Sequence, residues 1–232
     1  MNASRTARER VRAELIREIT DIARRHLATE GAAGLSLRAV ARDMGMVSSA
    51  IYRYFPSRDD LLTALIINGY NAIGDAVEKA DAACPREDFT RRWLAVCRAV
   101  RDWALAHPHE YALLYGSPVP GYRAPADTIG PASRDTIVYG RIIAEAHQEG
   151  RLSPPPMCPE PPAVLSPDIE AVRAMMPGVP GDVVARAVIA WTSLFGMVSF
   201  ELFGQFNNVI EHRAELFEHN MACLARLLGL SG

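Results

Sequence analysis

Apolar residues recur along most of the chain at the three- and four-residue spacing of amphipathic helices. No segment alternates apolar and polar positions in the manner of a half-buried strand. The segment 7–30 is one example, with apolar positions at Val11, Leu15, Ile19, Ile22, Ala23 and Leu27. The pattern predicts an all-α protein.

Glycine, proline and capping residues divide this periodicity into separate helices. We expect helices over residues 7–30, 36–44, 47–54, 57–82, 89–106, 110–115, 133–149, 167–176, 181–205 and 208–228. The proline-containing stretches 116–131 and 153–167 are expected to be irregular.

The segment 36–62, SLRAVARDMGMVSSAIYRYFPSRDDLL, predicts a helix, a tight turn and a second short helix. Ser36 caps the first helix, and Gly45 forms the turn at a positive φ, where a Cβ would be costly. Pro56 ends the second helix. Ser57 then caps the next, with Asp59 and Asp60 in the first turn, where the helix dipole favours acids. This is a helix-turn-helix, whose second helix enters the DNA major groove.

The same segment resembles the DNA-binding domain of the TetR family of transcriptional regulators. The resemblance rests on Gly31, Gly34, Ser36–Arg38, Val40, Ala41, Gly45, Ile51, Tyr52, Tyr54–Pro56 and Ser57–Leu62. It implies a helix-turn-helix domain over residues 1–56 and a helical ligand-binding and dimerisation domain over residues 57–232. It also implies a homodimeric repressor that binds a near-palindromic double-stranded DNA operator and is released by a small-molecule effector. An activator, a helix-turn-helix protein without a ligand and a small helical enzyme are the alternatives.

Charge is distributed unevenly along the chain, although the formal net charge is only −2. Residues 1–60 hold 11 Arg against 8 acidic residues, whereas the rest holds 14 basic and 19 acidic residues. A basic end on an acidic body suits local DNA contact. The arginines of residues 1–12 form either a basic arm that adds DNA contacts or a solvated tail: Arg5, Arg8, Arg10 and Arg12.

The expected DNA contacts fall into two groups. On the second helix, Ser48, Ser49, Arg53 and, near its start, Val47 should face base edges. The resemblance places Tyr52 and Tyr54 near the DNA backbone, although Tyr54 could instead belong to the domain core. Helix starts, which offer free N–H groups to phosphates, carry the second group: Ser36, Arg38, Ser57 and Arg58. Arg58 occupies the position of the family's phosphate-binding lysine. Val47 departs from the usual Ser or Thr, so the second helix either is capped by Ser48 or starts uncapped, at a cost of about 1 kcal/mol.

The second half carries weaker signals. Residues 107–122 and 190–204 resemble the C-terminal domain of a TetR subgroup named for a Trp-His-Gly pattern, with Trp191 and Gly196 present but no matching histidine. Candidate effector-pocket residues, which could equally form plain core, are Trp103, Tyr111, Tyr115, Met175, Trp191 and Phe195. The last two helices predict a dimer surface, with burial inside the monomer as the alternative: Ala190, Gly196, Val198, Ser199, Leu202, Phe206, Phe217, Met221 and Leu224.

Enzymatic and metal chemistry find little support in the sequence. His107, His109 and Glu110 lie close together, but Pro108 interrupts them and no third ligand follows at a zinc spacing. The four cysteines show no CxxC spacing, which is typical of reduced thiols. We therefore expect no catalytic residues, no metal and no cofactor. The longest apolar stretch, 183–206, is interrupted by two charges, and the N-terminus is charged, so we expect a cytoplasmic protein with no membrane partner.

Overall fold

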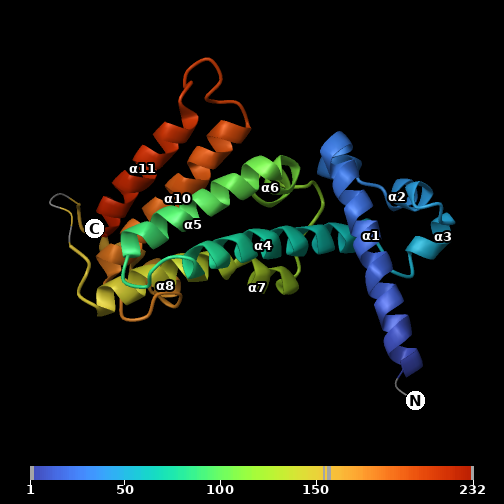
Figure 1. Ribbon diagram of the computed structural model, residues 1–232, viewed down its shortest axis with the longest axis horizontal. Coiled ribbons are helices and arrows are strands. Elements are labelled where there is room, and N and C mark those ends of the chain that lie inside the picture. The colour runs from blue at the N-terminus through green and yellow to red at the C-terminus, as the bar shows by residue number, and fades with distance from the viewer. Residues whose placement is uncertain (1–2, 154, 156–157, 231–232) are drawn as a thin grey trace. The chain divides into compact units, whose positions relative to one another are not determined.

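The computed structural model describes residues 3–153, 155 and 158–230 (Figure 1). Helices dominate this part, whose only β pairing is an isolated antiparallel bridge between Leu152 and Leu230, so the all-α prediction is confirmed. The α-helices are α1 (Ala3–Gly34), α2 (Leu37–Asp43), α3 (Ser48–Ile51), α4 (Arg58–Ala82), α5 (Phe89–Ala106), α6 (Pro108–Tyr115), α7 (Ile129–Ala132), α8 (Arg134–Gln148), α9 (Ser166–Arg173), α10 (Gly181–Leu202) and α11 (Arg213–Leu228). Two 3₁₀ turns, η1 (Ala126–Thr128) and η2 (Ala163–Leu165), precede α7 and α9.

The chain forms two compact units. The first comprises Met1–Tyr70 and His107–Pro131, and the second comprises Asn71–Ala106 and Ala132–Gly232. The expected boundary at residue 56 falls inside the first unit, because the start of α4 belongs to the same buried cluster as α1 and α2. Helix α4 therefore begins in the first unit and ends in the second. The division of function between the two parts stays a prediction.

The core of the first unit is built from one face each of α1, α2 and α4. Helix α1 is interrupted at Gly31, whose φ of 68° is outside the helical region. The buried cluster combines residues of these three helices with Leu35 of the α1–α2 loop, Ile51 of α3 and Phe55 of the segment after α3. Its members are Ile19, Ile22, Ala23, Leu35, Leu37, Val40, Ala41, Ile51, Phe55, Leu61, Leu62 and Leu65. Helix α6 is tied to α1 by an ion pair of 3.0 Å between Arg24 Nε and Glu110 Oε2. Glu110, considered above as a metal ligand, thus has a structural role.

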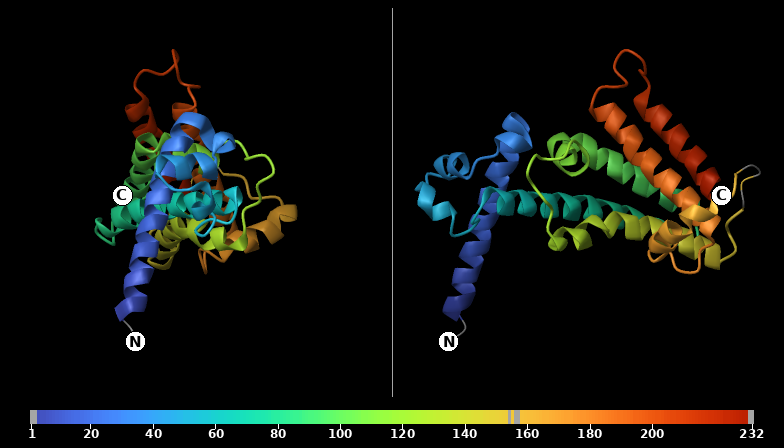
Figure 2. Two further views of the ribbon diagram at one scale, coloured as in Figure 1. Left: turned by 90° about the vertical axis from the view of Figure 1, so that its right-hand side faces the viewer. Right: turned by 180° about the vertical axis from the view of Figure 1, so that it is seen from behind.

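The second unit packs around α5. This helix contacts α8, α10 and α11, and its apolar face is buried. Trp93 is 1% exposed and donates its indole N–H to the carbonyl of Met221 in α11 over 3.0 Å. Helices α10 and α11 run antiparallel beside each other, as the views from front and back agree (Figures 1 and 2). This antiparallel pair forms one side of the unit.

A buried ion network joins three helices of the second unit. Arg92 of α5 is fully buried, and its Nε donates to Asp81 of α4 over 2.6 Å and its Nη1 to Glu145 of α8 over 2.7 Å. Arg141 of α8 adds a second ion pair to Asp81 over 2.7 Å. Burial alone would raise the pKa of Asp81, but the hydrogen bonds from Arg92 and Arg141 outweigh it and lower the pKa below its ordinary value.

Helix α8 also holds the middle of α4 through Arg134. Its guanidinium bonds to the carbonyl of Asn71 and to the carboxylates of Asp75 and Glu78. The backbone of α4 lies close to this arginine, because a Cβ added at Gly74 would lie 2.9 Å from the Arg134 side chain. Arg134 of α8 therefore holds α4 through contacts that extend over about two helical turns, from Asn71 to Glu78.

Several expected elements differ from the observed ones, among them the stretch 153–167, expected to be irregular, which contains η2 and the start of α9. The second helix of the helix-turn-helix was expected over residues 47–54, but α3 ends at Ile51 and continues as turns bonded through Ala50 O and Ile51 O. The stretch 116–131, expected to be irregular, contains η1 and most of α7. Helix α10 ends at Leu202, earlier than the expected residue 205, and α11 begins at Arg213, later than the expected residue 208. The connection between them spans residues 203–212, in which Asn208 has a φ of 61°. Periodicity does not resolve such helix ends.

Helix α10 passes a test of length and composition for a membrane span, with a mean hydropathy of 1.7 in its most apolar window. Among the described residues it is the one helix that does so. The same test is passed by core helices of soluble proteins, and α10 packs against α5, α9 and α11. This packing accounts for part of its apolar composition, since 44% of that window is buried inside the protein.

Candidate nucleic-acid interface and effector cavity

The turn between α2 and α3 has the predicted geometry. Gly45 has a φ of 66°, a left-handed conformation that glycine adopts without a Cβ clash. Ile51 and Phe55 are buried in the core of the first unit and so fix α3 against α1 and α2. The opposite side of α3 is solvent-exposed, and it carries Ser48, Ser49, Tyr52 and Arg53. The predicted base-reading residues therefore lie together on the outer surface.

The start of α3 is not capped by a side chain. Val47 occupies the N-cap position with 72% of its surface exposed and makes no capping hydrogen bond. The first turn closes through the backbone instead, with Ala50 N donating to Val47 O over 2.8 Å. Of the two possibilities left by the sequence, the uncapped start is observed. A short, uncapped helix depends on its packing for stability.

The basic N-terminal residues continue α1 rather than forming a separate tail, since helix begins at Ala3. The side chain of Arg5 lies outside the described part of the chain. Arg12 reaches the end of α3, where Nη1 donates to Arg53 O over 3.3 Å and the guanidinium lies 5.3 Å from the centre of the Tyr54 ring. Arg8 and Arg12 also line a small cleft beside Tyr54. Tyr54 is half-buried and packs against the core, and its contact with the DNA backbone stays a prediction.

The two predicted phosphate clamps differ in structure. At the start of α2, Ser36 is the N-cap residue but makes no side-chain cap, and Arg38 is exposed with no hydrogen bond or ion pair to any described residue. At the start of α4, Ser57 and Asp60 form a capping box: Asp60 N donates to Ser57 Oγ over 3.1 Å, and Ser57 N donates to Asp60 Oδ2 over 2.9 Å. The serine cap predicted at Ser57 is confirmed.

Arg58 has a structural role that the sequence did not reveal. Its Nη2 donates to Ala32 O over 2.6 Å and its Nε to Leu35 O over 3.1 Å. These carbonyls lie at the end of α1 and in the loop after it, where helical partners are missing. The guanidinium thus ties the start of α4 to the end of α1. No local sequence signal identifies this contact, because the two segments meet only in the folded chain.

The pocket residues predicted in the second half do not lie together. Met175 and Trp191 line a cavity of about 340 Å³ in the second unit, together with Trp93, Thr136 and Tyr139. Tyr111 and Tyr115 belong to the first unit, where their rings lie 5.0 Å apart, and Tyr115 meets Tyr70 edge to face at 6.0 Å. Trp103 and Phe195 are in the second unit but are not among the residues that line this cavity.

The sequence did not identify Trp93, Thr136 or Tyr139 as cavity residues. Trp93 lies on the buried apolar face of α5, and Tyr139 and Thr136 lie on the amphipathic helix α8. The centres of the Trp93 and Tyr139 rings lie 5.7 Å apart and their planes are tilted by 59°, so the two rings form adjoining walls of the cavity. The sequence feature that could have indicated this cavity is the presence of aromatic residues on two of the helices that line it.

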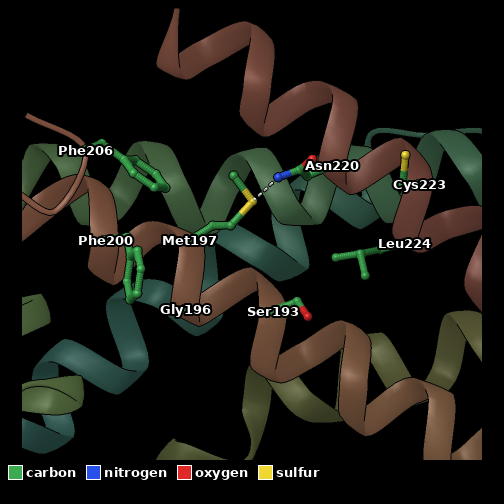
Figure 3. A pocket seen from close by; sticks show the side chains of 8 residues that line it. All are labelled: Ser193, Gly196, Met197, Phe200, Phe206, Asn220, Cys223 and Leu224. Atoms are coloured by element: carbon green, nitrogen blue, oxygen red, sulfur yellow. Dashed lines mark hydrogen bonds between the residues drawn. The ribbon is translucent and has the colours of Figure 1, made fainter. Parts of the chain in front are cut away.

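The predicted dimer surface needs correction at four positions. Ala190, Val198, Phe217 and Met221 are at most 2% exposed, so they are packed inside the protomer and cannot meet a second chain. Gly196, Phe206 and Leu224 instead line an open groove of about 450 Å³ between α10 and α11 (Figure 3). Ser199 and Leu202 are half-buried.

The groove and its surroundings are apolar and exposed. Met197 and Phe200 of α10 complete it with Asn220 and Cys223 of α11, and Asn220 Nδ2 donates to the Met197 sulfur over 3.0 Å. Large apolar side chains of α10 and the segment after it remain exposed at Ile189, Phe200 and Phe203, whereas the exposed Val188 and Trp191 line the separate cavity. Gly196 leaves open space, because a Cβ added there would meet no atom within 4 Å. This face of α10 has no covering element in the described chain.

Comparisons with known proteins agree with these two regions. Residues 19–65 match the sequence family described as bacterial regulatory proteins, tetR family, and residues 93–224 match the family described as tetracyclin repressor-like, C-terminal domain. Proteins named HTH-type transcriptional regulators from Mycobacterium tuberculosis and Mycobacterium bovis are 42% identical over 211 residues, covering 87% of this chain and 85% of theirs.

Solved structures share the fold. A crystal structure of a regulatory protein, SCO4313, has a TM-score of 0.77 at 34% identity and covers 93% of this chain and 97% of its own. A protein of unknown function from Rhodococcus sp. RHA1 has a TM-score of 0.71 at 24% identity, covering 93% and 95%, which supports the fold alone. The subgroup named for a Trp-His-Gly pattern is not tested by these matches. The chain belongs to the TetR family, and it is a helix-turn-helix transcriptional regulator that binds DNA.

Proposed function

We propose that this regulator is a cytoplasmic repressor that binds a near-palindromic operator as a homodimer and leaves it when a small molecule binds. The proposal rests on the uncovered apolar face of α10 and α11, taken together with a reading helix of only four residues. One such short helix contacts few base pairs. Two of them, related by a two-fold axis, read two half-sites and make the operator a palindrome.

The DNA contacts are proposed to divide by type. Ser48, Ser49 and Arg53 read base edges, because they share the exposed side of α3. Arg38 binds a phosphate, because its guanidinium has no partner among the described residues. Val47, at the start of α3, is proposed to face base edges as well. The other proposed backbone contacts are Ser36, Tyr52, Tyr54, Ser57 and Arg58.

The dimer contact is proposed to be the groove face, without the four buried residues. Gly196, Phe206 and Leu224 lie in the groove, and Met197, Phe200 and Phe203 extend it. A second copy placed there would bury these side chains in a four-helix arrangement. Obligate interfaces of this kind are large and apolar, often above about 2,000 Å² in total.

The effector is proposed to occupy the cavity lined by Met175 and Trp191. It lies in the second unit, whereas α3 lies in the first, and α4 is the helix common to both. Release from DNA requires that the effector bind one conformation of the protein more tightly than the other. An activator would use the same DNA-binding residues, dimer contact and cavity. The effect of the protein on expression from the regulated promoter therefore decides between repressor and activator.

The test is a gel-shift assay with genomic fragments, followed by a promoter fusion. Arg53→Ala should weaken binding to the selected operator by about 1–3 kcal/mol and leave binding to random DNA almost unchanged. Equal losses on both DNAs would assign Arg53 to the backbone contacts. Loss of expression on deletion of the gene would identify an activator and contradict repression.

A further inference from the structure

The cavity of the second unit has an aromatic and thioether lining. Trp93, Tyr139 and Trp191 supply rings, and Met175 and Met176 supply flexible side chains. The indole N–H of Trp93 is already bonded to Met221 O, so Trp93 offers ring carbons rather than a donor. Trp191 is 38% exposed, whereas Trp93 is buried, so the cavity runs from the surface to the core.

Charge is absent from the described residues that line the cavity, whose polar groups include the hydroxyls of Thr136 and Tyr139. Asp135 lies next to the lining residue Thr136 and is buried. Its Oδ1 accepts a hydrogen bond from Thr136 Oγ1 over 3.3 Å, and burial raises its pKa, which favours the uncharged carboxyl. Other charged side chains next to the lining residues in sequence face other partners. Arg134 binds Asp75 and Glu78 of α4, and Arg186 binds Asp182. A charged ligand would therefore lose its hydration without gaining a counter-ion, which is strongly unfavourable.

The walls are closely packed, which limits the size of the ligand. A Cβ added at Gly140 of α8 would lie 2.5 Å from the carbonyl oxygen of Met175, so α8 and the segment after α9 are in direct backbone contact. The volume of about 340 Å³ is near the lower end of the range for sites that hold drug-sized molecules, roughly 300–1,000 Å³. Methionine side chains can adjust to shape more readily than this backbone contact can.

We propose that the cavity takes an uncharged molecule with a planar, fused aromatic ring system and a small neutral polar group. The rings would stack on or meet the edges of Trp93, Tyr139 and Trp191, and the polar group would lie near the hydroxyl of Thr136. The inference rests on the proposed function in that this cavity is the effector site. It adds the chemical class of the effector and the residue that would meet its polar group.

The test uses probes of one shape and different charge. Binding of 2-naphthamide, 2-naphthoate and 2-naphthamidine to the full chain is measured by calorimetry, with decahydro-2-naphthamide as the non-planar control. We expect the neutral amide to bind about tenfold or more tightly than either charged probe and than the decahydro control. Tightest binding of the amidine would overturn the inference in favour of a site for cations. Equal binding of the decahydro amide would overturn the aromatic part.

A pair of variants places the probes in the cavity. Thr136→Asp puts a carboxylate into the lining, at the third residue of α8, where the helix dipole favours an acid. Thr136→Asn is its uncharged match. The aspartate variant alone should shift the preference from the amide to the amidine, with thermal melts as the check that both variants fold. An unchanged preference in a folded aspartate variant would mean that the probes bind elsewhere, and it would overturn the inference.

Operator binding separates this inference from the proposed function. If the amide binds in the cavity but does not weaken the gel shift, the ligand class stands and release by an effector is wrong. If no probe binds while the protein still shifts its operator, the ligand class is wrong and DNA binding stands. If the amide binds and also weakens the shift, both are supported.

Discussion

At the scale of single residues, two arginines at helix starts show how the same side chain serves different purposes. Arg38 is exposed and makes no hydrogen bond or ion pair to any described residue, whereas the Arg58 guanidinium donates to the carbonyls of Ala32 and Leu35 in the first unit. Both positions resemble phosphate sites in the sequence. Arg58 therefore has a structural role in addition to its proposed phosphate contact, whereas Arg38 has only the proposed one.

Arg38→Ala is expected to lower the salt dependence of DNA binding without changing the melting temperature. Each phosphate contact contributes about one unit to the slope of log affinity against log salt, and the loss should be equal on operator and random DNA. Fluorescence anisotropy over a range of salt concentrations measures the slope. An unchanged slope would show that Arg38 does not contact a phosphate.

Arg58→Ala is expected to lower stability as well, because the carbonyls of Ala32 and Leu35 lose their donors. The cost should be about 1 kcal/mol in the free energy of unfolding, measured by urea titration. Arg58→Lys is the matched control. Lysine keeps the charge but lacks the planar guanidinium, whose separate N–H groups donate to the two carbonyls at once. If Arg58→Ala leaves stability intact and reduces only the salt slope, the residue acts through DNA alone.

At the scale of helices, the sequence predicted most elements and missed their mutual packing. Gly45, the Ser57 cap and the bounds of α5 follow from local chemistry, and they are observed as predicted. Helix α10 is different, because it is apolar on several sides and packs against α5, α9 and α11. Periodicity cannot tell which apolar side is buried, so Ala190 and Val198 were assigned to the surface. Periodicity likewise cannot tell that Tyr111 and Tyr115 belong to the first unit and Trp191 to the second, so all three were predicted to line one pocket.

The buried network predicts a large effect at the end of α4. Asp81→Asn leaves Arg92 fully buried with a weakened partner, and the expected cost is about 3–5 kcal/mol in the free energy of unfolding. Glu218→Gln is the control, since its pair with Arg98 has both side chains more than 40% exposed and should contribute at most about 1 kcal/mol. Equal effects in urea titrations would contradict a special role for burial.

Acid should abolish the difference between the wild type and Asp81→Asn. The pKa of Asp81 is lowered in the folded state, so its contribution to stability is present above its ordinary pKa of 3.8. It is lost as the pH falls through the lower, folded-state pKa. Thermal melts from neutral pH to below 3.8 should therefore converge for the two proteins. A constant difference across this range would show that the carboxylate charge is not what stabilises Arg92.

At the scale of the whole molecule, the groove between α10 and α11 predicts assembly. Gly196→Glu should give monomers with reduced affinity for a two-half-site operator, because a charge would be buried at the interface. The monomer should keep its fold, since a side chain at this position meets only open space. Sedimentation at micromolar concentration measures the assembly. Gly196→Ala is the matched control, and it should favour the helix by roughly 1 kcal/mol.

A dimeric Gly196→Glu protein with full operator affinity would place the interface elsewhere. A wild-type protein that sediments as a monomer would contradict the proposed homodimer itself.

The sharing of α4 between the two units has a consequence for the timing of local opening. Leu61 and Leu65 belong to the first core, while Asn71, Asp75 and Glu78 are held by Arg134 in the second unit. A helix is a cooperative structure, so amides near one end gain protection when the other end is held more firmly. Hydrogen exchange should therefore slow at Leu61 and Leu65 when a ligand fills the cavity of the second unit. Arg134→Ala should shorten the reach of that protection along the helix.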